Sequence, residues 1–366
     1  MTDHEGRKQQ PLTLTTAARV ARGRYPSDLL AGSPGLLIAP QAGAYSSPRY
    51  APELHPLDSE WYFSGSTSCA LASLVSGVRT CLLGTPTVAA HLPSGAFTLV
   101  DSSLHLAQRF PAMMRNDIMI SRVEDAEFDA RYHSVLLDPP WYFPELVQWL
   151  QIALQNVTVG GRVILPLLGE ATRPSAIEDR AQVLSLLSEF GEIEVRRDAV
   201  EYDIPLFEER ALFAAGIQLS GPWRRADLAI AEVFKVPQRD RLGRPANERK
   251  MAATSWSTFL IGNQVVKLRD GVAERPGCGF VDQVDGVPQF TLDSVSRRDP
   301  RLASVDIWTS RNRVGRVGNF NRIRGALTTL ADARTVTLAA GELTHQGFNP
   351  DELTNLLELL ELSDND

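Results

Sequence analysis

The feature that most constrains this chain is an apolar run that ends in two prolines. Residues 134–137, Ser-Val-Leu-Leu, have the composition of a buried strand, and Asp138, Pro139, Pro140 and Trp141 follow directly. Proline fixes φ, has no backbone N–H and restricts the residue before it, so the strand has to end here. In an open parallel α/β sheet, ligands bind outside the carboxyl ends of the strands, which places Asp138 at a binding crevice.

These four residues carry groups suited to binding and orienting an amine. The Asp138 carboxylate and the Pro139 carbonyl are two acceptors that could hold an NH₂ group in one orientation, which is catalysis by positioning. The Trp141 ring offers a flat face for a planar substrate, and such stacking contributes about 1 to 3 kcal/mol per base in nucleic-acid complexes. An Asp-Pro pair can also start a turn for purely local reasons, and this alternative predicts no ligand here.

Short strands alternate with helical patterns around this motif, which is typical of βαβ units and a parallel sheet. The connection that begins at Tyr202 could line a pocket, but an ordinary connection is the favoured interpretation. The sequence therefore predicts a doubly wound α/β fold. Its expected strands are 80–83, 96–100, 118–120, 134–137, 162–166, 192–200 and 228–234, and its expected helices include 66–75, 144–155 and 177–190, with a turn at Gly160-Gly161.

The segment from about Trp61 to Lys235 resembles a class I S-adenosylmethionine-dependent methyltransferase of the N6-adenine type. It is similar to the branch that includes the lysine methyltransferases of elongation factor 1A. Three stretches carry the resemblance: the aromatic entry motif 61–64, Trp-Tyr-Phe-Ser, the first loop 83–87, Leu-Gly-Thr-Pro-Thr, and the tetrapeptide at 138–141. It implies a Rossmann-like, seven-stranded class I methyltransferase sheet, with S-adenosyl-L-methionine as cofactor and no metal.

The resemblance also implies roles for individual residues. The tetrapeptide, Asp138, Pro139, Pro140 and Trp141, would be catalytic. The first loop keeps a single glycine where this fold usually has several, so its evidence for a cofactor is weak. An acid at the end of the second strand accepts ribose hydroxyls in related folds, although it could equally cap a helix. The expected cofactor contacts are Leu83, Gly84, Thr85, Pro86, Asp101, Glu124 and Asp125.

Charge is distributed unevenly along the chain. Residues 58–234 contain 13 basic and 23 acidic side chains, whereas residues 235–334 contain 18 basic and 10 acidic ones. Five arginines and no acid lie between 307 and 331, and such a stretch could hold phosphates, although charge runs are more often solvated surfaces. The expected substrate-binding residues are Trp61, Tyr62, Phe63, Arg311, Arg313 and Arg316.

Three functions follow from these features. Adenine N6 in nucleic acid is the leading acceptor, since a flipped base would stack on Trp141. A protein lysine is the alternative, because an acidic catalytic surface suits a basic peptide. A catalytically inactive binding or assembly module is the third, because fold alone does not establish function. The expected partner is a nucleic acid or a protein acceptor, and an accessory protein is also considered.

Composition and patterning suggest three regions. Residues 1–57 are rich in Pro, Gly and Ser and are expected to form a loosely ordered arm with a helix at 15–24. Residues 58–235 are the expected methyltransferase domain, and residues 236–366 a smaller α+β accessory domain. The latter has strands within 256–269 and at 304–310, and a capped helix from 349 to about 362. A polar start and no long apolar stretch predict a cytoplasmic protein without a membrane span.

Overall fold

The computed structural model describes residues 52–362, apart from 59, 104, 107–109, 171, 220, 238–254, 276–278, 297–298 and 334. The predicted helix at 15–24 lies outside the described residues. None of the helices in the described part of the chain is both long and apolar enough to cross a membrane.

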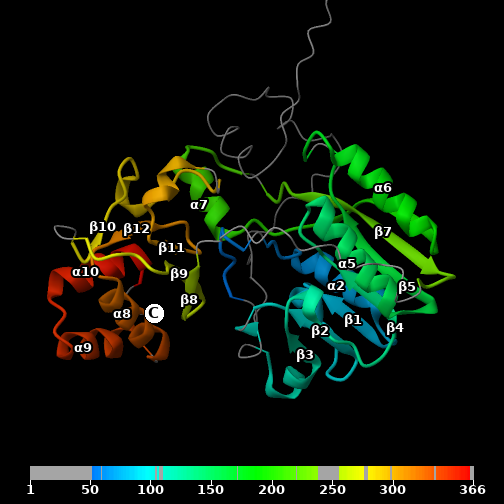
Figure 1. The fold of residues 1–366 in the computed structure, drawn as a ribbon, viewed down its shortest axis with the longest axis horizontal. Coiled ribbons are helices and arrows are strands. Elements are labelled where there is room, and N and C mark those ends of the chain that lie inside the picture. Colours follow the sequence, from blue (N-terminus) through cyan, green and yellow to red (C-terminus); the bar gives the residue numbers. More distant parts are fainter. Residues whose placement is uncertain are drawn as a thin grey trace, which may run out of the picture.

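The larger part of the fold is a seven-stranded sheet with strand order β3-β2-β1-β4-β5-β7-β6 (Figure 1). The first five strands are parallel, and β7 is antiparallel to both of its neighbours. This is the order and direction of a class I methyltransferase sheet, so the predicted fold class is confirmed. The strands are β1 (Thr80–Leu83), β2 (Phe97–Asp101), β3 (Ile118–Ile120), β4 (Tyr132–Leu137), β5 (Val157–Leu167), β6 (Gly191–Glu201) and β7 (Arg225–Val233).

Helices cover both faces of this sheet, which is why the central strands read as continuous apolar runs. Every residue of β1 is buried. Cys81 and Leu83 belong to the core shared with α5 and α6, whereas Leu82 belongs to the core shared with α2 and α3. These helices are α2 (Gly65–Val75), α3 (Pro86–Ala89), α5 (Phe143–Asn156) and α6 (Ala176–Ser188).

Two local predictions in this region are wrong. The expected turn at Gly160-Gly161 is part of β5, which begins at Val157, and the pairing with β4 shifts register between Tyr132 and Ser134. Glycine is required in this irregular stretch, because a Cβ on Gly161 would lie 2.7 Å from the His133 carbonyl oxygen. The segment after β6, for which an ordinary connection is the favoured interpretation, contributes Tyr202 to a pocket and continues into the helix α7 (Leu206–Ala214).

The carboxyl-terminal part is a smaller α+β unit, as predicted, with a five-stranded antiparallel sheet of order β10-β12-β11-β9-β8. Its helices pack beside this sheet (Figure 1). The predicted strands at 256–269 and the capped helix are present, whereas β12, α8 and α9 were not predicted. The elements are β8 (Trp256–Ile261), β9 (Gln264–Arg269), β10 (Val281–Asp282), β11 (Ile307–Thr309), β12 (Val314–Val317), α8 (Phe320–Asp332), α9 (Val336–His345) and α10 (Pro350–Leu360).

Residues 52–63, which we call the strap, pass between the two sheets (Figure 1). Its first part was expected to belong to a loose arm, but the described residues from position 52 onward are packed. His55 is fully buried, and its Nε2 lies 2.9 Å from the Trp308 carbonyl oxygen. Leu57 packs against the apolar cluster that contains Trp308. The prediction of a loosely ordered arm is therefore wrong for residues 52–57.

The amino terminus of α10 provides a test of this packing. Asn349 and Glu352 form a capping box in which each side chain accepts from the other's backbone N–H, at 2.9 and 3.0 Å. We expect Asn349→Ala to lower the free energy of unfolding by about 1 kcal/mol in urea titrations. The matched change Asn355→Ala, at an exposed position of the same helix, should leave it unchanged or slightly higher. Equal losses in both variants would contradict the capping role.

Candidate active site

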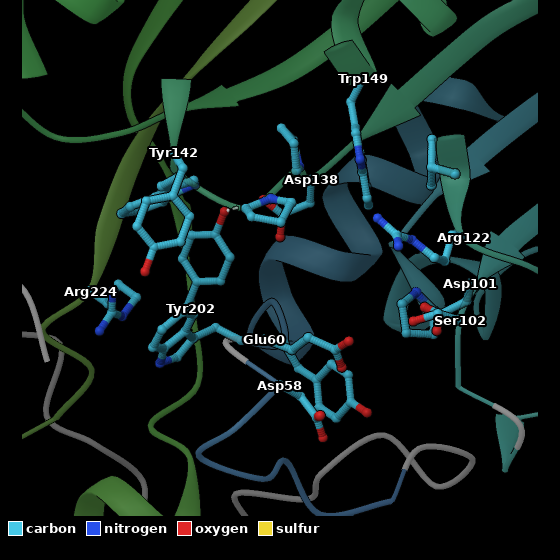
Figure 2. Close-up of a pocket in the computed structure, with 18 of the residues that line it drawn as sticks. Asp58, Glu60, Asp101, Ser102, Arg122, Asp138, Tyr142, Trp149, Tyr202 and Arg224 are labelled. Atoms are coloured by element: carbon cyan, nitrogen blue, oxygen red, sulfur yellow. Dashed lines mark hydrogen bonds between the residues drawn. The ribbon is translucent and has the colours of Figure 1, made fainter. Parts of the chain in front are cut away.

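A cavity of about 420 Å³ opens at the carboxyl ends of β1, β2 and β4 (Figure 2). This is the edge of the sheet where ligands bind in parallel α/β folds, and the volume lies within the range of small-molecule sites. Of the residues predicted from the sequence, the cavity lining includes Trp61, Tyr62, Gly84, Pro86, Asp101, Glu124, Asp138, Pro139, Pro140 and Trp141.

Asp138 lies at the point where β4 ends. Its backbone N–H donates to the Leu83 carbonyl at 3.1 Å, and its Oδ1 accepts a hydrogen bond of 2.8 Å from the Tyr202 hydroxyl. Burial raises the pKa of the Asp138 carboxyl to about 7, although the bond from Tyr202 works in the opposite direction. The carboxyl can therefore gain or lose a proton near neutral pH, which is what a general base requires.

Tyr202 lines the pocket, so the favoured interpretation of its segment as an ordinary connection is wrong. It follows β6, and its ring packs against Phe63 at a centroid distance of 5.0 Å and edge-on against Trp141 at 5.6 Å. Phe63 and Tyr202 are also bridged through their backbones. The tyrosine is thus held rigidly with its hydroxyl on Asp138. No local motif marks this residue, because its partner is 64 positions away in the sequence.

Two arginines fix the aromatic walls of the pocket. Arg173 donates to the Trp141 carbonyl and pairs with Asp179 at 2.7 Å, so the backbone after the two prolines is anchored. The Arg224 guanidinium lies 4.0 Å from the centre of the Trp61 ring and 5.9 Å from that of Trp141. Such stacking of a cation on an aromatic face holds both rings in place.

The first loop and the helix α5 form the other side of the pocket. Gly84 has a φ of +66°, and a Cβ there would lie 3.0 Å from two ring atoms of Trp149. Only glycine fits this position without strain. The Trp149 Nε1 donates to Glu124 at 3.0 Å, while the second carboxylate oxygen of Glu124 pairs with Arg122 at 3.4 Å. Glu124 therefore lines the pocket with both oxygens already engaged.

The groups beside Gly84 suit the cofactor that the sequence implied. Asp101 ends β2 inside the pocket, and its Oδ1 accepts the Ser103 N–H at 2.8 Å. Burial raises the pKa of its carboxyl to about 6. A buried carboxylate acceptor at this strand end matches a ligand that carries hydroxyls.

Several predicted contacts lie elsewhere. Phe63 and Leu83 are buried in the core, and the Thr85 side chain is buried behind the loop. Asp125 is exposed and does not line the pocket. Phe63 and Leu83 act indirectly, since one holds the Tyr202 ring and the other accepts from the Asp138 backbone. These four residues are therefore not on the pocket surface, because strand alternation and loop geometry turn them away from it.

The arginines predicted to bind substrate do not line the pocket either. Arg311 pairs with Glu53, Arg313 with Glu361 and Arg316 with Asp285. Another arginine of the stretch, Arg322, pairs with Glu352. A run of arginines in sequence is thus dispersed into separate ion pairs, and the expectation of an unpaired phosphate-binding surface is wrong for these residues.

Comparisons with known proteins give only distant similarities. No family model and no curated protein matches the chain. Among solved structures, a branched-chain polyamine synthase mutein from Thermus thermophilus is 17% identical, with a TM-score of 0.42, over 51% of this chain and 61% of that one. The N-methyltransferase NodS from Bradyrhizobium japonicum is 14% identical, with a TM-score of 0.31, over 46% and 84%.

An rRNA methylase from Streptococcus thermophilus is 10% identical, with a TM-score of 0.29, over 46% of this chain and 95% of that one. With TM-scores below 0.5, these similarities say nothing about the activity of this chain. The fold assignment rests instead on the observed order and direction of the strands.

The raised pKa of Asp138 predicts a pH-dependent stability. The unfolded chain loses this proton near pH 4 and the folded protein near pH 7, so the free energy of unfolding should fall as pH rises through this window. We expect Asp138→Asn to be more stable than the wild type at pH 8, by a few kcal/mol at most (about 1.4 kcal/mol per pKa unit), and nearly equal at pH 4. Denaturant titrations at both pH values test this.

The control is Asp125→Asn, which makes the same change in charge at an exposed position outside the pocket. It should show no such difference between the two pH values. If Asp138→Asn is as stable as the wild type at pH 8, then the Asp138 carboxyl is not desolvated in the folded protein.

Proposed function

We propose that this protein is an S-adenosylmethionine-dependent methyltransferase whose acceptor is an amine nitrogen. The observation that carries the proposal is the Asp138 carboxylate, which ends β4 inside the pocket beside the Pro139 carbonyl and is bonded to Tyr202. Two acceptors at one fixed strand end suit the orientation of an amine rather than of a hydroxyl, because an amine offers two or more N–H donors.

The pocket would divide its two ligands between its sides. Asp101 would accept the ribose hydroxyls of the cofactor, and the backbone at Gly84 would bind its amino-acid end. Trp149 and Glu124 would form the wall beside the base. Asp138 and Tyr202 would surround the acceptor (Figure 2), together with Trp141, whose ring packs edge-on against Tyr202.

Catalysis would depend on orientation and on one proton. When bound, the cofactor supplies a methyl group on a sulfonium, and the new N–C bond forms as the S–C bond breaks with its electron pair kept by sulfur. Asp138 and the Pro139 carbonyl would point the nitrogen lone pair at the methyl carbon. The Asp138 carboxylate, with a pKa of about 7, would take the proton that the amine releases. The Tyr202 hydroxyl keeps that carboxylate in place.

The lining of the pocket helps to choose between two methyl acceptors, adenine N6 and an aliphatic amine. The faces of Trp141 and Tyr142, both of which line the pocket, support adenine N6 in nucleic acid. The acidic lining supports a cationic amine such as a lysine side chain. Because the arginines that would hold phosphates are already ion-paired, we place the aliphatic amine first and adenine second.

Replacement of Asp138 tests the catalytic role. We expect Asp138→Ala to reduce methyl transfer by about 100-fold or more, because both the orientation and the proton acceptor are lost. The assay is mass-spectrometric detection of label moved from isotopically labelled cofactor to lysine peptides, oligoamines and adenine-containing oligonucleotides. Binding of S-adenosylhomocysteine should be retained. Undiminished transfer in the variant would contradict the role of Asp138.

Calorimetric titration with S-adenosylhomocysteine tests the cofactor side. We expect Asp101→Ala to weaken binding by about 10- to 100-fold, the effect of losing hydrogen bonds to a charged group. The exposed neighbour Asp125 provides the matched control, and Asp125→Ala should bind as the wild type does. If the wild-type protein does not bind the ligand at all, the chain is better described as a binding module with a methyltransferase fold.

A further inference from the structure

The charge of the pocket is not balanced by its own basic residues. Each arginine in the lining is already paired with a carboxylate, and these pairs are Arg122 with Glu124 at 3.4 Å, Arg173 with Asp179 at 2.7 Å and Arg224 with Glu208 at 3.6 Å. The lining also contains Asp58, Glu60, Asp101 and Asp138. Of these four acids, only Asp58 has a basic partner among the described residues, namely Lys267.

Glu60 is the least compensated of these acids. It belongs to the strap, is partly buried, and has no hydrogen bond or ion pair in the described part of the chain. Desolvation raises the pKa of its carboxyl well above the ordinary value, the charges of Asp101 and Asp58 raise it further, and Lys267 works in the opposite direction. A carboxyl that lines a ligand pocket beside two other acids and has no ion pair of its own is suited to a cation that arrives with the ligand.

The position of Glu60 separates it from the reacting group. Glu60 and Asp58 lie on the side of the pocket opposite Asp138 (Figure 2), and Tyr62 is also part of the lining. The pocket therefore has two acidic ends with aromatic surface between them. The methylene chain of an aliphatic amine can pack on such a surface, and an ammonium group is attracted to an aromatic face.

The second domain fixes this acidic wall. Glu53, at the start of the strap, accepts from Ser310 at 2.7 Å and pairs with Arg311 at 3.2 Å. Lys267 of β9 pairs with Asp58, two residues before Glu60. These contacts hold the strap before Glu60, and the Asp203 N–H, which donates to the Tyr62 carbonyl at 2.9 Å, holds it after Glu60, so the backbone that carries this carboxyl is fixed on both sides.

We propose that Glu60, with Asp58 beside it, is a second ammonium-binding subsite, and that the acceptor is a linear diamine or longer oligoamine. This rests on the function proposed above. The reacting nitrogen would lie at Asp138, and the distal ammonium would pair with Glu60. An acceptor with a single amine would leave Glu60 unpaired, so the subsite selects for two cationic groups at a fixed separation.

The test uses full-length protein saturated with S-adenosylhomocysteine and compares 1,4-diaminobutane and spermidine with butylamine by calorimetry. We expect the wild type to bind the better of the two polyvalent amines about 10-fold or more tightly than butylamine, the worth of one charged hydrogen-bonded pair. Glu60→Gln should remove most of this preference. Glu192→Gln, an exposed position on β6, should preserve it.

Equal affinity for the mono- and polyvalent amines, or an undiminished preference in Glu60→Gln, would overturn the proposal. So would a Glu60→Gln variant that weakens only S-adenosylhomocysteine binding, because Glu60 would then serve the cofactor. Label transfer to a lysine peptide or an adenine-containing oligonucleotide, with none to either oligoamine, would also overturn it while leaving the methyltransferase function intact. Failure of the wild type to bind S-adenosylhomocysteine would instead refute the proposed function, and titration of the apoprotein with the same amines would still test the subsite.

Discussion

The hydrogen bond between the Tyr202 hydroxyl and the Asp138 carboxylate is the contact on which the site depends. It joins the end of β4 to the segment after β6. Because the carboxyl is buried, this bond both orients it and limits the rise of its pKa. Two neighbouring residues also fix the positions of these side chains. The Phe63 ring packs against the Tyr202 ring, and the Leu83 carbonyl accepts from the Asp138 backbone N–H.

The sheet could be predicted from the sequence because its signals are local. The strands β1 and β3 are predicted at their observed bounds, and the two prolines after β4 mark where that strand ends. The same local signals put Asp101 and Asp138 at the carboxyl ends of β2 and β4, the two strands that flank β1. Once the strand order follows the methyltransferase arrangement, these two acids necessarily share one pocket.

The ion pairs and the environments of individual side chains could not be predicted, because they arise from contacts between residues that are distant in the sequence. The arginines near the end of the chain looked like one basic surface, yet Glu53 and Glu361 neutralise Arg311 and Arg313. Glu60 shows no motif of its own, and its isolation becomes visible only when the pocket is assembled. Phe63 was assigned to the substrate because it belongs to an aromatic run, but the backbone turns it into the core.

The strap has a consequence for the biosynthesis of the protein. Glu53 reaches Arg311 across 258 positions of sequence, and His55 reaches Trp308 across 253. During translation, the seven-stranded sheet can therefore form before the residues that clamp the strap have left the ribosome. Until the last third of the polypeptide has docked, the nascent chain would hold the Asp138 carboxylate in an incomplete cavity. The wall that contains Asp58 and Glu60 would be fixed only after this docking.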